Sequence, residues 1–275
     1  MFARRSPEGA AVLADGLVLG YGRHVALEEA TFAVPVGASV ALIGPNGSGK
    51  STVLRALAGV LSPRAGRLEV PALARRAAVA LVLQTTDVDR SLPITVREAV
   101  TLARYARLGP WRPQRREDRA AVDGALERLD VADLASRQLH ELSGGQRQRV
   151  LVAQGLAQGA ELVLLDEPVT GLDAVSRDLI LQAVTAERAA GRTVVLSTHD
   201  FADARRCDLV LLLANRVVAF GPPGEVLTDG PLTEAYGSQV LRFEDGSVVL
   251  DDPHHAHPSQ EHQAHDEAGG AARGA

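Results

Sequence analysis

The segment GPNGSGKS at residues 44–51 brings glycines, a lysine and a serine together at a spacing that suits phosphate chemistry. The apolar run SVALIG precedes it and a helix-like stretch follows it, so we expect a turn between a strand and a helix. In such a turn, glycines let backbone N–H groups close around phosphate oxygens, and the helix N-terminus adds its dipole. The segment therefore predicts a nucleoside triphosphate site with contacts from Gly44, Pro45, Asn46, Gly47, Ser48, Gly49, Lys50, Ser51 and Thr52.

Two adjacent acids, Asp166 and Glu167, add the chemistry that a phosphate cradle lacks, and they end the apolar run ELVLLDE at 161–167. We expect Lys50 to reach the β- and γ-phosphates, and Ser51 and Asp166 to ligate Mg²⁺. Glu167 could polarise an attacking water as a general base. The bland alternatives are a chance glycine-rich turn and a solvated acidic turn. The apolar strands that lead into both segments disfavour these alternatives.

The stretch LSGGQRQRV at 142–150 is a second glycine-rich segment that opens a helix, so it could be a second phosphate cradle or only a flexible helix cap. With it, the sequence resembles the ATP-binding subunits of ABC transporters over about residues 12–236. The resemblance implies an ATPase whose two copies pair head to tail as a C₂ dimer. Each ATP would lie between one P-loop and the signature of the opposite subunit, formed by Leu142, Ser143, Gly144, Gly145 and Gln146.

The resemblance also gives roles to four isolated residues. Tyr21 would stack on adenine, although a lone tyrosine could equally belong to the core. Gln84 would sense Mg²⁺ or water, and would couple the ATP site to the membrane part of a transporter. With Ser51 and Asp166, it would complete the Mg²⁺ ligands. Asp173, in TGLD at 170–173, would lie at the dimer seam. His199 would contact the γ-phosphate, where a lone histidine is more often structural. The implied catalytic residues are Glu167, His199 and Gln84.

Alternating strand-like and helix-like segments must position these residues. The apolar runs at 39–44, 78–84, 161–167 and 192–198 each lead into a helical or mixed segment, which predicts a parallel sheet covered on both faces. Residues 17–38 predict short strands with turns instead, as an antiparallel β piece that leads into the sheet.

The region between the second and third runs has apolar residues at helical spacing, in 94–108 and again in 119–135. We expect a helical subdomain at about 86–143. The predicted fold is therefore α/β, a P-loop NTPase core with an N-terminal antiparallel β piece and this helical subdomain. One departure from the family follows the signature: where the family often reads A-R-A-L, this chain has Ala153, Gln154, Gly155 and Leu156, and the glycine should weaken the helix.

Composition and charge limit the classes of partner. We expect an ATP-binding domain at 1–240 and an acidic, disordered tail at 241–275. The net charge is −5, and residues 251–275 hold five acids and one base, so the body is near neutral and lacks the basic face of a nucleic-acid binder. The single cysteine, Cys207, fits a reducing compartment. Without a membrane-length apolar run or a clean signal peptide, the sequence predicts a cytosolic chain. The resemblance to ABC transporter subunits implies that it is peripheral on the cytoplasmic face of the cell membrane.

Two segments bear on the cargo. Residues 85–109 and PLTEAYG at 231–237 resemble the matching regions of zinc and manganese importer ATPases. Import of a divalent metal is thus the favoured function, with a polytopic permease and an extracytoplasmic binding protein as partners. The alternatives are another solute, an exporter, a soluble ABC ATPase without a transport role, or a metal-binding protein. Trp111, in a polar loop, is either a local packing residue or a permease contact.

Five of the eight histidines lie in the tail. Imidazole suits Zn²⁺, but a tail has no rigid frame that would impose tetrahedral geometry. The tail therefore predicts at most weak Zn²⁺ binding, and a solvated polar tail is the alternative. The histidines concerned are His254, His255, His257, His262 and His265.

Overall fold

The computed structural model describes residues 9–84, 93–109, 112–237, 240–242 and 248–250. Two compact units divide the chain, one at 1–238 and one at 239–275, and each is described by itself. Within the described residues, no helix is both long enough and apolar enough to cross a membrane.

The first unit begins with an antiparallel sheet in the order β2-β1-β4, formed by β1 (Ala10–Tyr21), β2 (His24–Pro35) and β4 (Ala65–Glu69). Every second side chain through much of β1 is fully buried, which is the alternation of a strand with one face on a core. The predicted antiparallel β piece is confirmed. Its first two strands are longer than the sequence suggested, and the third was not foreseen.

The main sheet has the order β5-β6-β7-β3-β8-β9. Its first five strands run parallel, and only β9 is antiparallel to its neighbour. The predicted parallel sheet is therefore confirmed, with one antiparallel edge. Its strands are β3 (Ser39–Ile43), β5 (Val79–Val82), β6 (Leu162–Leu165), β7 (Thr193–Ser197), β8 (Leu209–Leu213) and β9 (Val217–Gly221).

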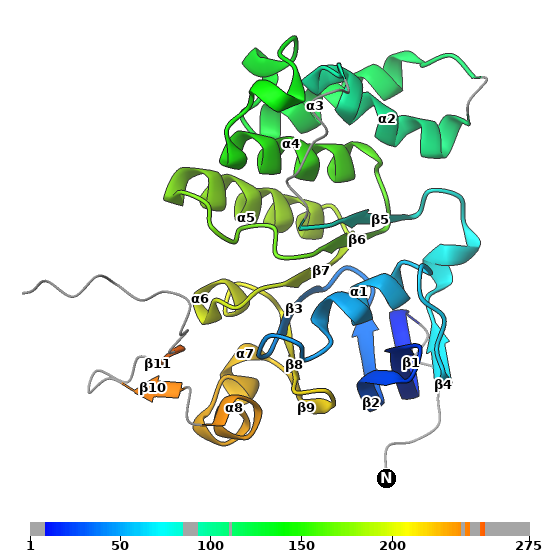
Figure 1. The fold of residues 1–275 in the computed structure, drawn as a ribbon. Helices are drawn as coiled ribbons and strands as arrows, with labels where there is room; N and C mark the ends of the chain where they lie inside the picture. Colours follow the sequence, from blue (N-terminus) through cyan, green and yellow to red (C-terminus); the bar gives the residue numbers. More distant parts are fainter. Residues whose placement is uncertain (1–8, 85–92, 110–111, 238–239, 243–247, 251–275) are drawn as a thin grey trace, which may run out of the picture. The chain divides into compact units, whose positions relative to one another are not determined.

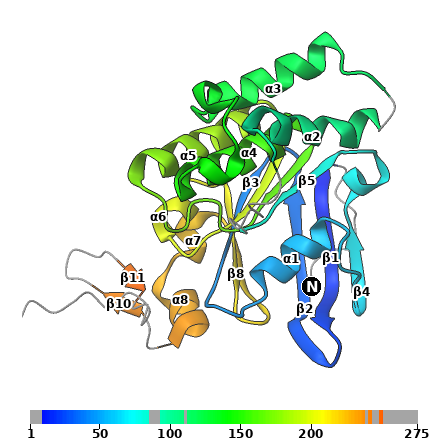
Figure 2. The ribbon, with the colours of Figure 1, turned by 45° about the horizontal axis from the view of Figure 1, so that its top comes forward.

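Helices cover both faces of the main sheet. Helix α1 (Lys50–Leu57) packs between this sheet and the antiparallel one, as Figure 2 shows, and its apolar side chains join one core with both. Among the described residues, four other helices cover the opposite face of the main sheet. These are α5 (Ala174–Ala189), α6 (Phe201–Ala204), α7 (Pro223–Val226) and α8 (Asp229–Tyr236).

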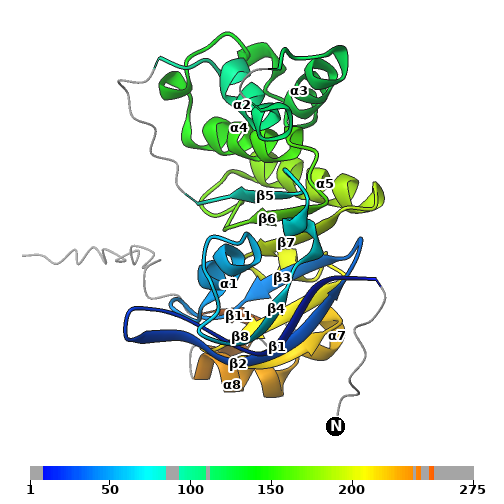
Figure 3. The same ribbon diagram turned by 90° about the vertical axis from the view of Figure 1, so that its right-hand side faces the viewer.

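A group of helices lies beyond the β5 edge of the sheet (Figures 1 and 3). It consists of α2 (Val96–Leu108) and α3 (Arg116–Arg128), both packed on α4 (Gly144–Ala157). Short 3₁₀ turns complete the unit at Pro71–Ala74, Ala132–Leu134 and Leu139–Glu141. Helix α2 begins where Thr95 and Glu98 form a capping box, with the Glu98 N–H donating to Thr95 at 3.3 Å. The helical character predicted between the second and third apolar runs is present.

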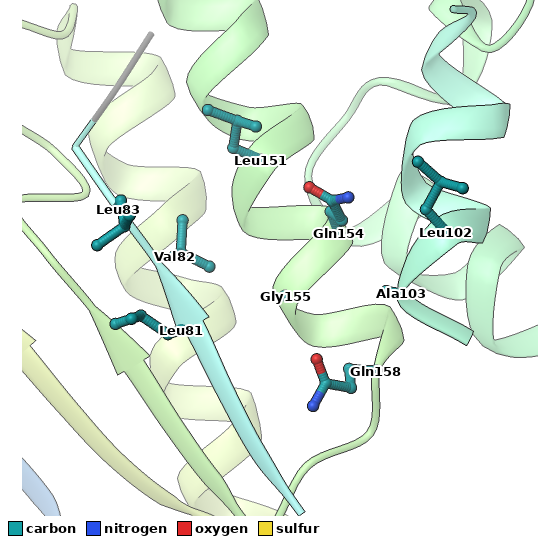
Figure 4. Close-up of a pocket in the computed structure, with 9 residues that line it drawn as sticks. All are labelled: Leu81, Val82, Leu83, Leu102, Ala103, Leu151, Gln154, Gly155 and Gln158. Carbon is teal, nitrogen blue, oxygen red and sulfur yellow. The ribbon is translucent and has the colours of Figure 1, made fainter. Parts of the chain in front are cut away.

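Helix α4 runs without a break through Gly155, the residue expected to weaken it. A β-carbon at Gly155 would lie 2.5 Å from Cγ2 of Val82 on β5, closer than real side-chain contacts (Figure 4). The glycine therefore lets α4 approach the edge strand of the sheet. The cost in helix propensity, about 1 kcal/mol relative to alanine, is exchanged for this close packing.

In the second unit, β10 (Val240–Arg242) pairs antiparallel with β11 (Val248–Leu250). This strand pair begins at the boundary between the predicted domain and the predicted tail, and it was not predicted from the sequence. The tail histidines at 254–265 lie outside the described residues.

Candidate functional site

The P-loop encloses its lysine. Lys50 opens α1, its side chain is buried, and its Nζ donates to the carbonyls of Gly44 at 2.8 Å and Pro45 at 3.1 Å. Burial lowers the pKa of Lys50, while the nearby carboxylates of Glu167 and Asp166 act in the opposite direction. A phosphate entering the loop would meet an ammonium group with little competing water.

The shape of the loop fits a bound phosphate. Gly44 has φ +149°, and a β-carbon there would lie 2.1 Å from the carbonyl oxygen of Leu213, so only glycine fits. The Ser48 hydroxyl is buried and has no hydrogen-bond partner within the described residues. An unpaired buried hydroxyl is costly, and a phosphate oxygen would satisfy it.

Asp166 stands beside the P-loop, directly after β6. Its Oδ1 accepts hydrogen bonds from Ser51 at 3.1 Å and from Ser197 at 2.7 Å, and the residue is 4% exposed. A hydroxyl and a carboxylate oxygen are hard oxygen donors, the kind of ligand that Mg²⁺ prefers. Ser51 and Asp166 therefore fit the ion that the sequence analysis placed between them.

Glu167 is held by three elements at once. Its backbone N–H donates to Ser197 Oγ at 2.8 Å, and its Oε2 accepts from Gln84 Nε2 at 3.0 Å and from Thr170 Oγ1 at 3.1 Å. The backbone of Glu167 has φ +46°, a left-handed conformation that is uncommon for a non-glycine residue. Such strain persists only where the surroundings fix it, and it is frequent at functional sites. Gln84 itself lies two residues beyond the end of β5.

Thr170 joins Glu167 to His199, and the sequence analysis gave this threonine no role of its own. His199 follows β7, and its Nδ1 lies 3.5 Å from Thr170 Oγ1, at the outer limit of a hydrogen bond. The carboxylate of Glu167 and the ring of His199 therefore flank one hydroxyl group. In the sequence, only the position of Thr170 in the TGLD motif could have indicated a role at this site.

The signature segment begins α4 with a capping box. Ser143 Oγ accepts from the Gln146 N–H at 3.2 Å, and Gln146 Oε1 accepts from the Ser143 N–H at 3.0 Å. A β-carbon at Gly145 would lie 3.1 Å from Ser176 Oγ and 3.2 Å from Asp173 Oδ2. The signature of a subunit therefore packs closely against that subunit's own Asp173. Leu142 is buried behind the cap, and Gly144 faces open space.

Asp173 caps α5, where its Oδ1 accepts from the Ser176 N–H at 2.9 Å. Hydrogen bonds from the backbone and hydroxyl of Ser176 lower the pKa of Asp173. The side chain is exposed, and the next residue but one, Val175, is 67% exposed.

Tyr21, at the end of β1, is 43% exposed, which rules out the alternative that it belongs to the core. Its hydroxyl accepts a 3.1 Å hydrogen bond from Arg55 on α1. The ring is therefore an exposed aromatic surface held beside the P-loop helix, where a base could stack.

Asn215 clamps the P-loop from outside, and the sequence analysis missed it. Its Nδ2 donates to the carbonyls of Gly47 at 3.1 Å and Ala26 at 3.3 Å, and its N–H donates to the Ser48 carbonyl at 3.2 Å. The residue has φ +56°, which asparagine tolerates better than most residues. The turn between β8 and β9 thus fixes the tip of the loop.

Several sequence-based predictions lie outside the described residues, namely those on 85–92, on Trp111 and on the tail histidines. In the part of the chain that the structure describes, no group of three or more His, Cys, Asp or Glu side chains could hold a metal ion by itself.

Comparison with known proteins gives the site a context. Residues 27–170 match the family model described as ABC transporter. The manganese transport system ATP-binding protein MntB of Listeria innocua is 38% identical over 84% of this chain and 98% of its own length. The zinc transport system ATP-binding protein TroB of Treponema pallidum is 38% identical over 84% of this chain and 88% of its own length. The chelated iron transport system membrane protein YfeB of Yersinia pestis is 34% identical, with coverages of 88% and 84%.

The solved structures agree on the fold. The chain matches cbiO1 from Clostridium perfringens, part of the ABC transporter complex cbiONQ, with a TM-score of 0.70 and 26% sequence identity. That match covers 82% of this chain and 94% of the other. The similarity in fold therefore extends over most of this chain.

Proposed function

This chain belongs to the ATP-binding subunits of ABC transporters, and we propose that the ATP it hydrolyses drives import of a divalent transition metal through a membrane permease. Membership of the family makes the chain an ATPase. The cargo is inferred from its relatives, which are named for manganese, zinc and chelated iron transport. The similarity of residues 231–237 to metal importer ATPases points the same way.

The observation that supports the site is the meeting of Gln84, Thr170 and Ser197 on Glu167, beside Asp166. In the proposed roles, Lys50 and the P-loop amides bind the phosphates, and Glu167 takes a proton from the attacking water. His199 orients that water or the γ-phosphate through its ring. Mg²⁺, held by Ser51, Asp166 and Gln84, would neutralise charge on the phosphates.

A head-to-tail dimer would complete each site. The signature residues lie against Asp173, and the signature stands at the start of α4, where the positive end of the helix dipole favours an anion. The exposed side chain of Val175 suits burial by a second copy. We propose that the signature of one subunit contacts the ATP bound by the other, and that Asp173 lies at the seam.

A groove beside Gln84, lined by both apolar and polar side chains, is the proposed docking site for the permease on the cytoplasmic face of the membrane. The groove has a volume of about 340 Å³ and lies between β5, α2 and α4 (Figure 4). Leu83 and Leu102 on its walls are 41% and 50% exposed, an unusual fraction for leucine. Its lining residues are Leu81, Val82, Leu83, Leu102, Ala103, Leu151, Gln154, Gly155 and Gln158.

Uptake of radioactive Mn²⁺ and Zn²⁺ tests the cargo, in cells that carry the natural permease and extracytoplasmic binding protein. Cells with this chain should accumulate one or both metals, and cells with Glu167→Gln should not. Efflux that depends on this chain would favour an exporter. If neither metal moves, a different solute or a role outside transport replaces metal import.

We propose only weak Zn²⁺ binding for the histidine-rich tail, as an addition to this function. Calorimetric titration with Zn²⁺ of the full chain, and of a chain ending at residue 250, tests it. The full chain should bind Zn²⁺ weakly and the shorter chain should lose that binding, while both hydrolyse ATP at the same basal rate. Equal heats from the two chains would contradict the proposal.

A further inference from the structure

Arg177 on α5 reaches across to α6 and holds two carboxylates. Its Nη2 forms ion pairs with Asp200 and, at 2.7 Å, with Oδ1 of Asp203. Its Nε donates to the same Asp203 oxygen at 3.1 Å. Asp200 is the residue directly after His199. One guanidinium group therefore fixes both the end of the segment that carries His199 and the helix that follows it.

The Asp203 end of this bridge is well buried. Asp203 is 2% exposed, and burial raises the pKa of its carboxyl, while the guanidinium of Arg177 opposes the rise. Its Oδ2 has no hydrogen-bond partner within the described residues. The hydrogen bonds and the charge of Arg177 therefore favour the ionised form of the Asp203 carboxyl against burial. The Arg177 side chain is 35% exposed, so the pair has one buried partner, and its geometry is more restricted than that of a pair exposed on both sides.

Asp200 controls the backbone on both sides of His199. Its N–H donates to Thr198 Oγ1 at 3.1 Å, and its Oδ1 accepts from the Ala202 N–H at 2.6 Å. The Thr198 N–H in turn donates to Leu42 of β3 at 3.0 Å. A shift of Asp200 would therefore move His199, which lies in the short segment between β7 and α6.

The other end of the bridge leads to the proposed dimer seam. Arg177 lies one turn after Asp173, and its N–H donates to the Asp173 carbonyl at 3.0 Å. Asp173 packs against Gly145 of the signature. Contacts therefore run without a gap from Gly145 through Asp173 and Arg177 to Asp200 and His199.

We propose that Arg177 is a positioning residue that couples the seam at Asp173 to His199. Docking of a subunit's signature on its partner's ATP would thereby set the histidine that acts on the subunit's own ATP. Arg177 touches no reacting atom and acts through Asp200. This inference rests on the proposed roles of His199 and Asp173. The test therefore measures the coupling between Arg177 and His199 directly.

The chain offers a matched control for Arg177→Ala. Arg206, two residues beyond the end of α6, pairs with Asp178 on α5, but at 3.4 Å and with side chains about half exposed. We expect Arg177→Ala to lower kcat about tenfold while the affinity for ATP changes less than about twofold, because positioning matters in the transition state and not in binding. Arg206→Ala should keep wild-type kcat. Arg177→Lys, which keeps the charge but not the fork, should recover part of the loss.

A double-mutant cycle with His199→Ala separates positioning from a general structural role. Single-turnover hydrolysis is measured for the two single variants and the double variant. If Arg177 acts through His199, the double variant is no slower than His199→Ala. If the two losses multiply, or if Arg177→Ala turns over like wild type, the inference is wrong. Full activity in Glu167→Gln would instead contradict the proposed function, so the two failures are distinguishable.

Discussion

The side-chain amide of Gln84 donates a 3.0 Å hydrogen bond to Oε2 of Glu167, across 83 residues of sequence. Leu83, the neighbour of Gln84, lines the groove between β5, α2 and α4. A partner that moves Leu83 would therefore disturb the hydrogen bond that orients the proposed base. A permease docked in the groove as proposed would have a short physical route to the chemistry, because Leu83 of the groove is next to Gln84, which is hydrogen-bonded to the carboxylate.

A charge in the groove should uncouple transport from hydrolysis. Leu102→Glu places a carboxylate on an apolar wall where a partner helix would have to desolvate it, so binding to the permease should weaken at least about tenfold. Basal ATPase of the isolated subunit should stay within about twofold of wild type, because Leu102 contacts no phosphate residue. Co-purification with the permease and ATPase assays of the isolated subunit measure the two effects.

Val60→Glu is the control for that substitution. Val60 is 70% exposed and lies after α1, outside the groove. It should retain the permease as wild type does. Equal retention of the permease by both variants would place the docking surface elsewhere.

Loss of the Asn215 amide should weaken ATP binding. The amide fixes the Gly47 carbonyl at the tip of the P-loop, and one hydrogen bond contributes about 1 kcal/mol, so Kd for ATP should rise about fivefold in Asn215→Gly. Glycine adopts φ +56° without strain, so any further loss in Asn215→Ala reports backbone strain. Fluorescent-nucleotide titration measures both variants. Wild-type affinity in both would show that the clamp has no role in binding.

The buried pair between Arg104 and Asp118 should govern the stability of the helices beyond the β5 edge. Arg104 donates to Asp118 at 2.6 Å and to the Ala157 carbonyl at 2.9 Å, so it ties α2 and α3 to the end of α4. Asp118→Ala leaves a buried guanidinium unpaired and should lower the free energy of unfolding by about 3–5 kcal/mol. Urea denaturation measures the change.

The Arg97–Asp123 pair joins the same two helices, α2 and α3, but its side chains are about half exposed. Asp123→Ala should therefore change the free energy of unfolding by less than about 1 kcal/mol. Similar losses in the free energy of unfolding for Asp118→Ala and Asp123→Ala would mean that burial does not determine how much the Arg104–Asp118 pair stabilises the fold.

Removal of Arg177 should make stability depend on pH through Asp203. The native pKa of Asp203 already lies above the unfolded value of 3.8, because burial and the charge of Asp200 raise it while Arg177 and Arg206 oppose the rise. In Arg177→Ala the native pKa should rise further. The native state then binds more protons than the unfolded state in the window above 3.8, so stability falls as pH increases through that window.

The destabilisation of Arg177→Ala relative to wild type should accordingly be larger near about pH 8 than near about pH 5. Urea midpoints at the two pH values provide the measurement. Adding Asp203→Asn should remove the difference. A destabilisation that does not vary with pH would show that Asp203 keeps its charge state without Arg177.

The sequence predicted those parts of the site that depend on residues close together in the chain. The spacing of Gly44, Lys50 and Ser51 marks a phosphate loop because the loop and its helix are contiguous. Asp166 was predictable because it ends the fully buried run of β6. Asn215 was missed because its contact with Gly47 spans 168 residues and appears only when β8 lies beside β3.

Strands and helices were likewise predictable only where residues close together in the chain determine them. The apolar run at 209–213, which forms β8, gave no strand prediction, since an apolar run alone does not distinguish a buried strand from a buried helix. In β1, register shifts between Ala14 and Leu17 and again before Gly20 interrupt the alternation, so one strand of 12 residues resembled several short ones. Gly155 suggested a weak helix, because its contact with Val82 cannot be seen in the sequence.

The proposed role of Glu167 as the general base is tested most directly by ATP hydrolysis in Glu167→Gln. Glutamine keeps the shape of the side chain but cannot take a proton, so turnover should fall at least about 100-fold while ATP affinity stays near wild type. Glu161→Gln, at an exposed acid paired with Arg75, is the control and should hydrolyse normally. We expect Glu167→Gln to form an ATP-bound dimer on size exclusion, and wild-type hydrolysis by that variant would contradict the role of Glu167 as the general base.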